Sequence, residues 1–312
     1  MATEVNSRIL NPDFFGDLKY GQLRNLLTSI KCDDTLDLQI RHNQIHIYYR
    51  GGKILDVKPH GAQSYKFALD ENYFQESNRH DRLLVKRLLN RDLPDFTAFF
   101  GVAKQALDIY LTSKKTAERE FQQLIVRTNN YSSIANSTDY FIVDIEYAKQ
   151  GSRFDLVALS WPSESFLRKL TKGYKPRLMI IEMKYGEAAL GGKAGLTKHH
   201  QDIETFIQNS SLNQNFKLEM EYLFLQKLQL GLIPCLERKK EWVDPIRFDD
   251  QMDIGYLIAD HDPASKRLIN ELVKLPVENT KFVTSNFAGY ALFNENVFGL
   301  AEFKGRFGKQ IG

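Results

Sequence analysis

The segment Arg177-Leu-Met-Ile-Ile-Glu-Met-Lys-Tyr-Gly186 constrains the fold more than any other stretch of the chain. The residues before Glu182 form a run of apolar β-formers, and the turn residues Pro176 and Gly186 bound the segment. This profile is typical of a buried central strand. Because side chains alternate across a strand, Glu182 and Lys184 are expected on the same face, one pleat apart. A buried carboxylate and ammonium are costly to desolvate, so either a core ion pair or site chemistry is expected there.

A second carboxylate, Asp155, lies in the predicted strand 154–161. If this strand pairs with 177–185, Asp155 converges with Glu182 and Lys184 at one end of the sheet. Two neighbouring carboxylates repel each other unless a cation lies between them, and Mg²⁺ prefers oxygen ligands. Such a site suits phosphodiester cleavage, because a metal ion lowers the pKa of bound water and a lysine offsets the developing negative charge.

Composition limits the class of protein. The chain has 312 residues, of which 43% are hydrophobic and 26% charged, so a globular fold is expected. The net charge of +3 is too small to indicate a nucleic-acid partner by itself. Cys32 and Cys235 are far apart and form no CxxC pair, which fits a reducing cytosol. We find no secretory signal and no apolar run of membrane-spanning length, so we expect a soluble, cytoplasmic protein without a membrane partner.

Two domains are predicted, with the boundary near residues 113–116. The first, 1–112, is expected to be an α+β accessory domain. Its predicted elements are a helix over 16–31, a small antiparallel sheet of hairpins over 36–70, and helices over 79–92 and 96–112. His42 and His46 fall on opposite arms of a predicted hairpin turn, which argues against a shared metal site.

The second predicted domain, 113–312, is mixed α/β. Its predicted elements are a helix over 117–129, strands over 140–147, 154–161 and 177–185, a short helix over 165–172, a helix beginning near Thr197, a helix over 213–230 ending at Gly231, a strand over 254–259 and a helix over 264–274. Setting aside the short helix and the helices over 213–230 and 264–274, the main order is helix, three strands, helix and strand.

Asp155 followed by Glu182-x-Lys184 at the end of an apolar strand resembles the PD-(D/E)xK nuclease superfamily. The resemblance covers roughly residues 117–260. It implies a restriction-endonuclease-like αβββαβ core with a mixed central sheet flanked by helices. It also implies a glutamate on the preceding helix, which is Glu118 with Glu120 as the competing choice, and a glutamine at Gln201. Two departures are Phe154 in place of the usual proline and the long separation between the two site strands.

The resemblance implies a nuclease that depends on Mg²⁺ or Mn²⁺, with DNA as the favoured substrate. Asp155 and Glu182, with the main-chain carbonyl of Met183, would hold the metal ion. Lys184 would assist the attacking water. Glu118 would lie just behind the metal ligands or at a second metal ion, and Gln201 would orient groups or touch the phosphate.

Positive charge gathers around this segment, as phosphate binding requires. The expected nucleic-acid contacts are Lys193, Lys198, His199 and His200. Trp161 is expected to pack in the core rather than stack on bases. Two other interpretations stay open: a non-catalytic module that binds nucleic acid or protein, and a defence-type effector nuclease controlled by residues 1–112. The same N-terminal part is a candidate for homodimer formation or for binding a protein partner.

Overall fold

The computed structural model describes residues 8–61, 64–75, 79–90, 95–114, 117–149, 151–163, 174–192, 195–233, 246–260, 265–285, 292 and 297–307. The chain divides into two compact units. The first comprises Met1–Gln123 and Leu225–Trp242, and the second comprises Leu124–Phe224 and Val243–Gly312. Both units contain a sheet and helices, so the chain is mixed α/β, as predicted.

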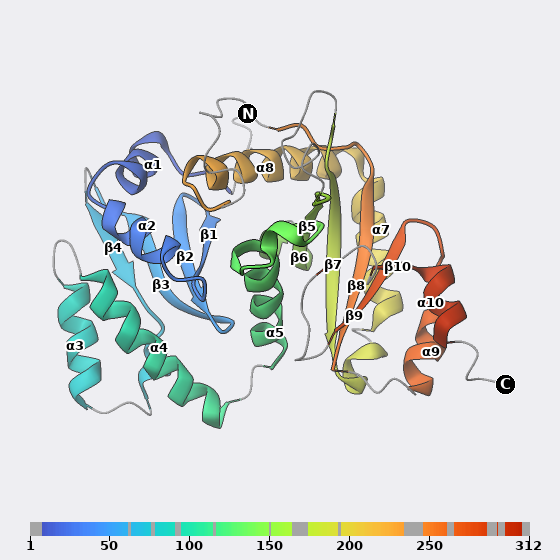
Figure 1. Cartoon of the computed structure of the whole chain (residues 1–312), viewed down its shortest axis with the longest axis horizontal. Coiled ribbons are helices and arrows are strands. Elements are labelled where there is room, and N and C mark those ends of the chain that lie inside the picture. The colour runs from blue at the N-terminus through green and yellow to red at the C-terminus, as the bar shows by residue number, and fades with distance from the viewer. Residues whose placement is uncertain are drawn as a thin grey trace. The chain divides into compact units, whose positions relative to one another are not determined.

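The first unit is built on an antiparallel sheet whose strands follow chain order, β1-β2-β3-β4, within the described residues (Figure 1). Its strands are β1 (Asp37–Arg41), β2 (Gln44–Tyr49), β3 (Gly52–Pro59) and β4 (Tyr65–Ala68). Its helices are α1 (Pro12–Lys19), α2 (Arg24–Lys31), the 3₁₀ helix η1 (Glu71–Phe74), α3 (Arg79–Leu89) and α4 (Phe96–Ser113). The predicted sheet of hairpins over 36–70 is therefore confirmed.

Tight turns join the first three strands. His42 and Asn43 have φ of 44° and 57°, and Arg50 and Gly51 have φ of 45° and 77°. Two successive residues with positive φ are the geometry of hairpin turns whose twist matches that of the strands. The hairpins therefore fix the register that buries the alternating apolar residues of β1, β2 and β3.

The helix predicted over 16–31 is wrong, because the structure has two short helices there. The side chain of Asn11 caps α1 by accepting a hydrogen bond from the Phe14 amide at 2.8 Å. The chain then turns at Gly21, where an added Cβ would lie 2.2 Å from the Asp17 carboxylate. The apolar spacing continues across this turn, which is why periodicity alone does not reveal the break.

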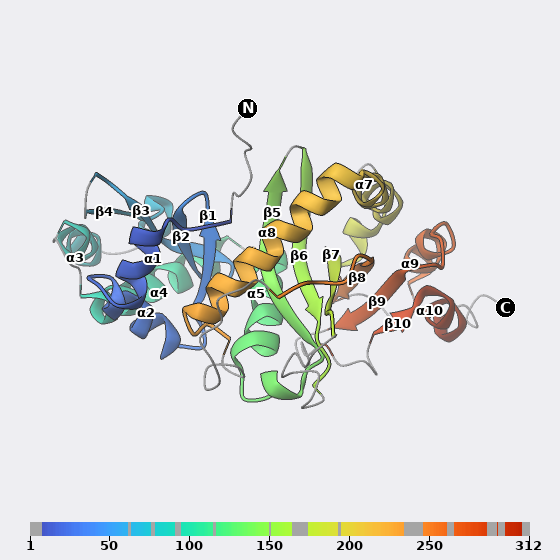
Figure 2. The ribbon, with the colours of Figure 1, turned by 90° about the horizontal axis from the view of Figure 1, so that it is seen from above.

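The second unit contains a mixed sheet with the order β10-β9-β8-β7-β6-β5 within the described residues (Figure 2). Its strands are β5 (Tyr140–Lys149), β6 (Ser152–Ser160), β7 (Arg177–Tyr185), β8 (Met252–Ala259), β9 (Thr280–Ser285) and β10 (Phe298–Gly299). Its helical elements are the π-helical turn η2 (Arg127–Tyr131), the 3₁₀ helices η3 (Ala135–Ser137) and η4 (Glu187–Leu190), and the helices α7 (Leu196–Gln208), α9 (Lys266–Leu272) and α10 (Leu300–Phe307).

Two helices contribute residues to both units. They are α5 (Ala117–Val126) and α8 (Ser210–Gln229). The predicted stop of α8 at Gly231 is confirmed, since Gly231 follows the helix with φ of 70°.

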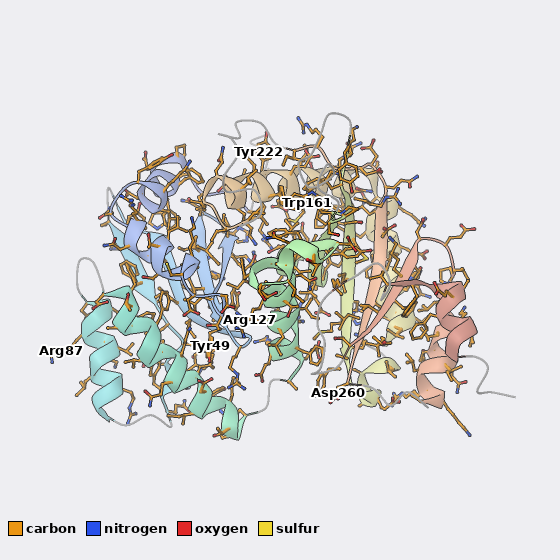
Figure 3. All side chains as sticks on the ribbon, in the orientation of Figure 1. Tyr49, Arg87, Arg127, Trp161, Tyr222 and Asp260 are labelled. Carbon is orange, nitrogen blue, oxygen red and sulfur yellow. The ribbon has the colours of Figure 1, made fainter. Side chains whose placement is uncertain are left out.

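Strand β7 is the inner strand at which the sheet changes direction. It pairs antiparallel with β6 and parallel with β8. The strand is buried from Leu178 to Lys184, as a central strand with both faces covered should be. Trp161, which is labelled in Figure 3 and directly follows β6, is fully buried. Its ring packs edge-on against Phe141 and Phe224. Its predicted place in the core is confirmed.

The short helix predicted over 165–172 lies outside the described residues. Within the part of the chain that the structure describes, no helix is both long enough and apolar enough to cross a membrane.

Candidate active site at the end of strand β7

The carboxylate of Asp155 reaches the end of β7. The last register pair that joins β6 and β7 is Leu156 with Ile181, and one step further along both strands lie Asp155 and Glu182. Asp155 Oδ2 accepts a hydrogen bond from the main-chain amide of Met183 at 2.8 Å. The Asp155 carboxylate is therefore held at the main chain of Met183, the residue between Glu182 and Lys184.

Glu182 and Lys184 form a buried ion pair on β7. Lys184 Nζ lies 2.7 Å from Glu182 Oε1, and the two residues are only 6% and 4% exposed. The alternation predicted from the sequence brings the two side chains together, since residues two apart on a strand share a face. Removing either partner would leave the other charge buried without its counter-ion, which is strongly destabilising.

His199 adds a second donor to the same carboxylate. Its Nδ1 lies 3.0 Å from Glu182 Oε1, the oxygen that Lys184 also contacts. His199 lies in the first turns of α7, which packs against β6 and β8. The sequence predicts His199 as a nucleic-acid contact, whereas the structure places its ring against a site carboxylate.

The neighbouring strand β8 supplies Tyr256, which is the register partner of Glu182. Its hydroxyl lies 3.0 Å from His200 Nδ1, and His200 Nε2 lies 3.2 Å from Glu204 Oε1. Burial raises the pKa of Tyr256 strongly, and the charges of Glu182 and Glu204 raise it further, so the hydroxyl stays protonated. His200 is only 2% exposed, so it lies in the interior and not on the surface.

The helical glutamates lie in the first unit. Glu118 is exposed in the first turn of α5, and its role stays a prediction from the resemblance. Its competitor Glu120 forms an ion pair with Arg50 at 2.6 Å, and Arg50 also contacts Asp108 at 2.8 Å. The ion pair with Arg50 therefore indicates a structural role for Glu120 within the first unit.

The remaining predicted residues lie on or just before α7. Gln201 is exposed, and its main-chain oxygen accepts a hydrogen bond from the hydroxyl of Thr205 at 2.7 Å. Lys198 is exposed and pairs with Asp202 one turn along the helix. Lys193 lies outside the described residues.

The donors at the end of β7 suit a hard cation. Asp155 and Glu182 offer carboxylate oxygens, and Met183, which directly follows Glu182 in the chain, offers a main-chain carbonyl oxygen. Mg²⁺ is commonly bound by one or two carboxylates and completes its shell with water and substrate phosphate. Among the described residues, no group of three or more His, Cys, Asp or Glu side chains is arranged to hold a metal ion. Asp155 and Glu182 together supply the two carboxylates that such a Mg²⁺ site uses.

The sequence pattern does not indicate that His199 contacts Glu182 or that Tyr256 lies beside Glu182. A histidine at a helix start gives no sign of which strand it will face. Tyr256 lies in an apolar strand, where a tyrosine is ordinary. Asp260, which follows β8 and is labelled in Figure 3, accepts a hydrogen bond from the hydroxyl of Tyr185 at the end of β7, at 2.9 Å. The positions of Tyr256 and Asp260 depend on the pairing of β7 with β8, which no local pattern specifies.

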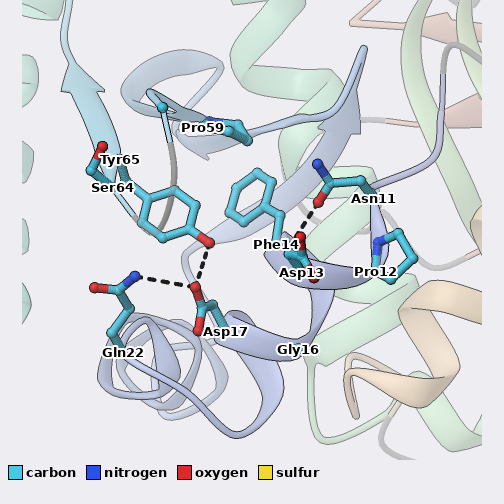
Figure 4. Close-up of a pocket in the computed structure, with 11 residues that line it drawn as sticks. Asn11, Pro12, Asp13, Phe14, Gly16, Asp17, Gln22, Pro59, Ser64 and Tyr65 are labelled. Carbon is cyan, nitrogen blue, oxygen red and sulfur yellow. Dashed lines mark hydrogen bonds between the residues drawn. The ribbon is translucent and has the colours of Figure 1, made fainter.

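The first unit has an open cavity of about 810 Å³ beside α1 (Figure 4). Asp17 Oδ2 accepts hydrogen bonds from the Tyr65 hydroxyl at 2.6 Å and from Gln22 Nε2 at 3.1 Å. The hydrogen bond from Tyr65 is the largest cause of the lowered pKa of Asp17. Asp17, Tyr65 and Gln22, which line the cavity, thus use these polar groups in hydrogen bonds to one another.

No family model, no curated protein and no solved structure matches this chain.

Proposed function

We propose that this protein is a metal-dependent nuclease that hydrolyses phosphodiester bonds, with DNA as the favoured substrate. The proposal includes a restriction-endonuclease-like core, formed by α5, β5, β6, β7, α7 and β8, and a cytoplasmic location. The order of these elements along the chain supports the proposed core, with α8 as an additional helix before β8.

One observation carries the proposal: the Asp155 carboxylate accepts a hydrogen bond from the main-chain amide of Met183, the residue between Glu182 and Lys184. This contact gathers two carboxylates and one ammonium where the strands β6 and β7 end their pairing. Glu182 and Lys184 are buried and Asp155 is half-buried, and buried charges are costly unless they are paired or bind a cation. A site that binds a cation and a phosphate accounts for all three residues at once.

Each residue has a defined task in the proposed reaction. Asp155, Glu182 and the carbonyl of Met183 would hold Mg²⁺ or Mn²⁺. When bound, the cation would neutralise charge on the scissile phosphate and lower the pKa of a water. Lys184 Nζ would orient the attacking water or donate to the oxygen that gains negative charge.

Residues on α7 extend the proposal to substrate binding. Lys198 is exposed and would contact the phosphate backbone, and Gln201 would orient groups at the site or contact a phosphate. Partner binding or dimer formation through the first unit is part of the same proposal.

The test is cleavage of supercoiled, linear and single-stranded DNA and of RNA, each with Mg²⁺, Mn²⁺ or excess EDTA. We expect the wild-type chain to cleave DNA only with the metal ion. Asp155→Asn and Lys184→Met should each lower kcat by at least about 100-fold, since each removes a charged group from the reaction centre.

The matched control is Asp250→Asn, a carboxylate in the same unit whose side chain is 84% exposed. It should cleave as the wild type does. Circular dichroism and thermal unfolding of every variant separate lost chemistry from lost folding. Cleavage that survives excess EDTA, or a fully active Asp155→Asn variant, would refute the proposal.

A second candidate follows from the contacts of Glu182 itself. Its Oε1 is already held by Lys184 and His199, as expected of a structural ion pair. On that interpretation the protein is a binding module for nucleic acid or protein on the same fold. Retention of DNA by the wild-type chain without cleavage under any metal condition would favour it.

A further inference from the structure

Both side-chain donors to Glu182 contact the same oxygen. Lys184 Nζ lies 2.7 Å from Oε1, and His199 Nδ1 lies 3.0 Å from it. Within the described part of the chain, no donor contacts Oε2. The carboxylate is thus fixed at one oxygen, and the other oxygen remains available to a ligand.

The residue after His199 orients helix α7 so that His199 faces this oxygen. His200 is buried and contacts the Tyr256 hydroxyl on β8 at 3.0 Å. Glu182 and Tyr256 are register partners on β7 and β8. Consecutive histidines therefore reach two side chains that lie side by side on neighbouring strands, and the contact of His200 sets the rotation of α7 that brings His199 onto Glu182.

We propose that His199 is a positioning residue: its Nδ1–H holds Oε1 of Glu182 so that Oε2 is presented to the divalent cation. This inference rests on the proposed function and assigns His199 a task other than the predicted contact with nucleic acid. Hydrogen bonds that orient a ligating carboxylate commonly change metal affinity by about 10- to 100-fold. The role needs only a proton on Nδ1, which both the charged ring and one neutral tautomer provide.

The geometry of the ring predicts which substitutes work. The amide nitrogen of asparagine can occupy nearly the place of Nδ1, because both are attached one atom beyond Cβ. The amide nitrogen of glutamine lies further out, nearer the place of Nε2. His199→Asn should therefore keep the contact with Glu182, whereas His199→Gln and His199→Ala should lose it.

The experiment measures Mn²⁺ binding to the full chain by isothermal titration calorimetry, with thermal unfolding of each variant as the folding control. We expect His199→Ala and His199→Gln to raise the Mn²⁺ Kd by about 10- to 100-fold, and His199→Asn by less than about threefold. Gln208→Ala, exposed at the end of α7, is the matched control and should bind as the wild type does. The side chain of His199 is 28% exposed, so its loss should leave the midpoint of unfolding nearly unchanged.

The outcomes separate the two proposals. Equal Mn²⁺ affinity of the wild type and His199→Ala would overturn the positioning role alone and leave the proposed nuclease intact. Equal loss in the asparagine and glutamine variants would also overturn it, since the place of Nδ1 would then not matter. A wild-type chain that binds no Mn²⁺ would overturn both proposals together.

Discussion

His46 on β2 shows how strongly burial acts on a single side chain. Its side chain is 14% exposed, and burial, followed by the neighbouring cations Lys53 and Arg41, lowers its pKa from 6.5 to about 3. Asp56 Oδ1 lies 3.4 Å from its Nε2, but Asp56 is itself paired with Lys53 at 2.7 Å. His46 is therefore neutral in the folded chain, which fits an interior role on the sheet.

This depressed pKa predicts acid sensitivity of the first unit. The unfolded chain binds a proton at His46 below pH 6.5 and the folded chain does not, so the full stability is present above pH 6.5 and is lost as the pH falls toward 3. Between pH 7 and pH 4.5 the free energy of unfolding should fall by about 2 to 3 kcal/mol from this residue. Urea unfolding at both pH values would measure it.

Comparison of variants isolates the contribution of His46. His46→Gln should lose less stability on acidification than the wild type, because glutamine takes up no proton. His60→Gln, at an exposed histidine of the same unit, should keep the wild-type dependence. Identical pH dependence in the His46→Gln variant would contradict the assignment.

The turn between β2 and β3 shows how an element depends on its neighbours. Gly51 has φ of 77°, and its amide donates to Gln123 Oε1 of α5 at 2.5 Å. An added Cβ there would lie 2.5 Å from the main-chain carbon of Arg119. The turn thus requires glycine both for its conformation and for the close approach of α5.

Gly51→Ala should therefore destabilise the first unit by about 2 to 4 kcal/mol, combining strain at positive φ with overpacking. Gly61→Ala is the matched control, because Gly61 has φ of 76° but its nearest neighbour, Ser64 Oγ, would lie 3.7 Å away. It should cost only about 1 kcal/mol, from the conformational term. Equal midpoints of chemical unfolding in the two variants would show that the approach of α5 does not matter.

The whole molecule assembles its first unit from two separate parts of the chain. Leu10 donates its amide to Gln226 at 3.0 Å, and Lys227, fully buried, lies 3.1 Å from Gln39. Gln123 Nε2 donates to the main-chain oxygen of Tyr48 at 3.0 Å. Residues beyond position 112 therefore satisfy polar groups of the N-terminal sheet. The boundary at 112/113 stays a prediction, and it can be tested directly.

A fragment of residues 1–112 should be much less stable than the same sheet in the full chain. A longer fragment, 1–127, contains Gln123 and so restores the hydrogen bond from the Gly51 amide to the Gln123 side chain. Hydrogen exchange of the Gly51 amide should therefore be about 10-fold slower in 1–127 than in 1–112. Hydrogen exchange measured by NMR would compare them. Equal protection in 1–112 and the full chain would support an independent domain that ends at residue 112.

Local pattern determined the type and place of most elements. The strand Arg177–Tyr185 has the predicted bounds, and the hairpins over 36–70 follow from alternation and turn residues. These features depend on neighbours in sequence, whose conformational preferences and periodic burial are readable from the chain. The pairing of Glu182 with Lys184 belongs to the same class, because residues two apart on a strand share a face.

Only the tertiary structure decided which distant groups meet. It brought Asp155 to the amide of Met183, His199 to Glu182, and residues 225–242 into the first unit. It also broke the predicted helix over 16–31, where the apolar spacing continues through a turn. The physical reason is that such contacts depend on strand pairing and helix rotation. Both are set by the packing of the whole unit, and neither can be read from the periodicity of the sequence.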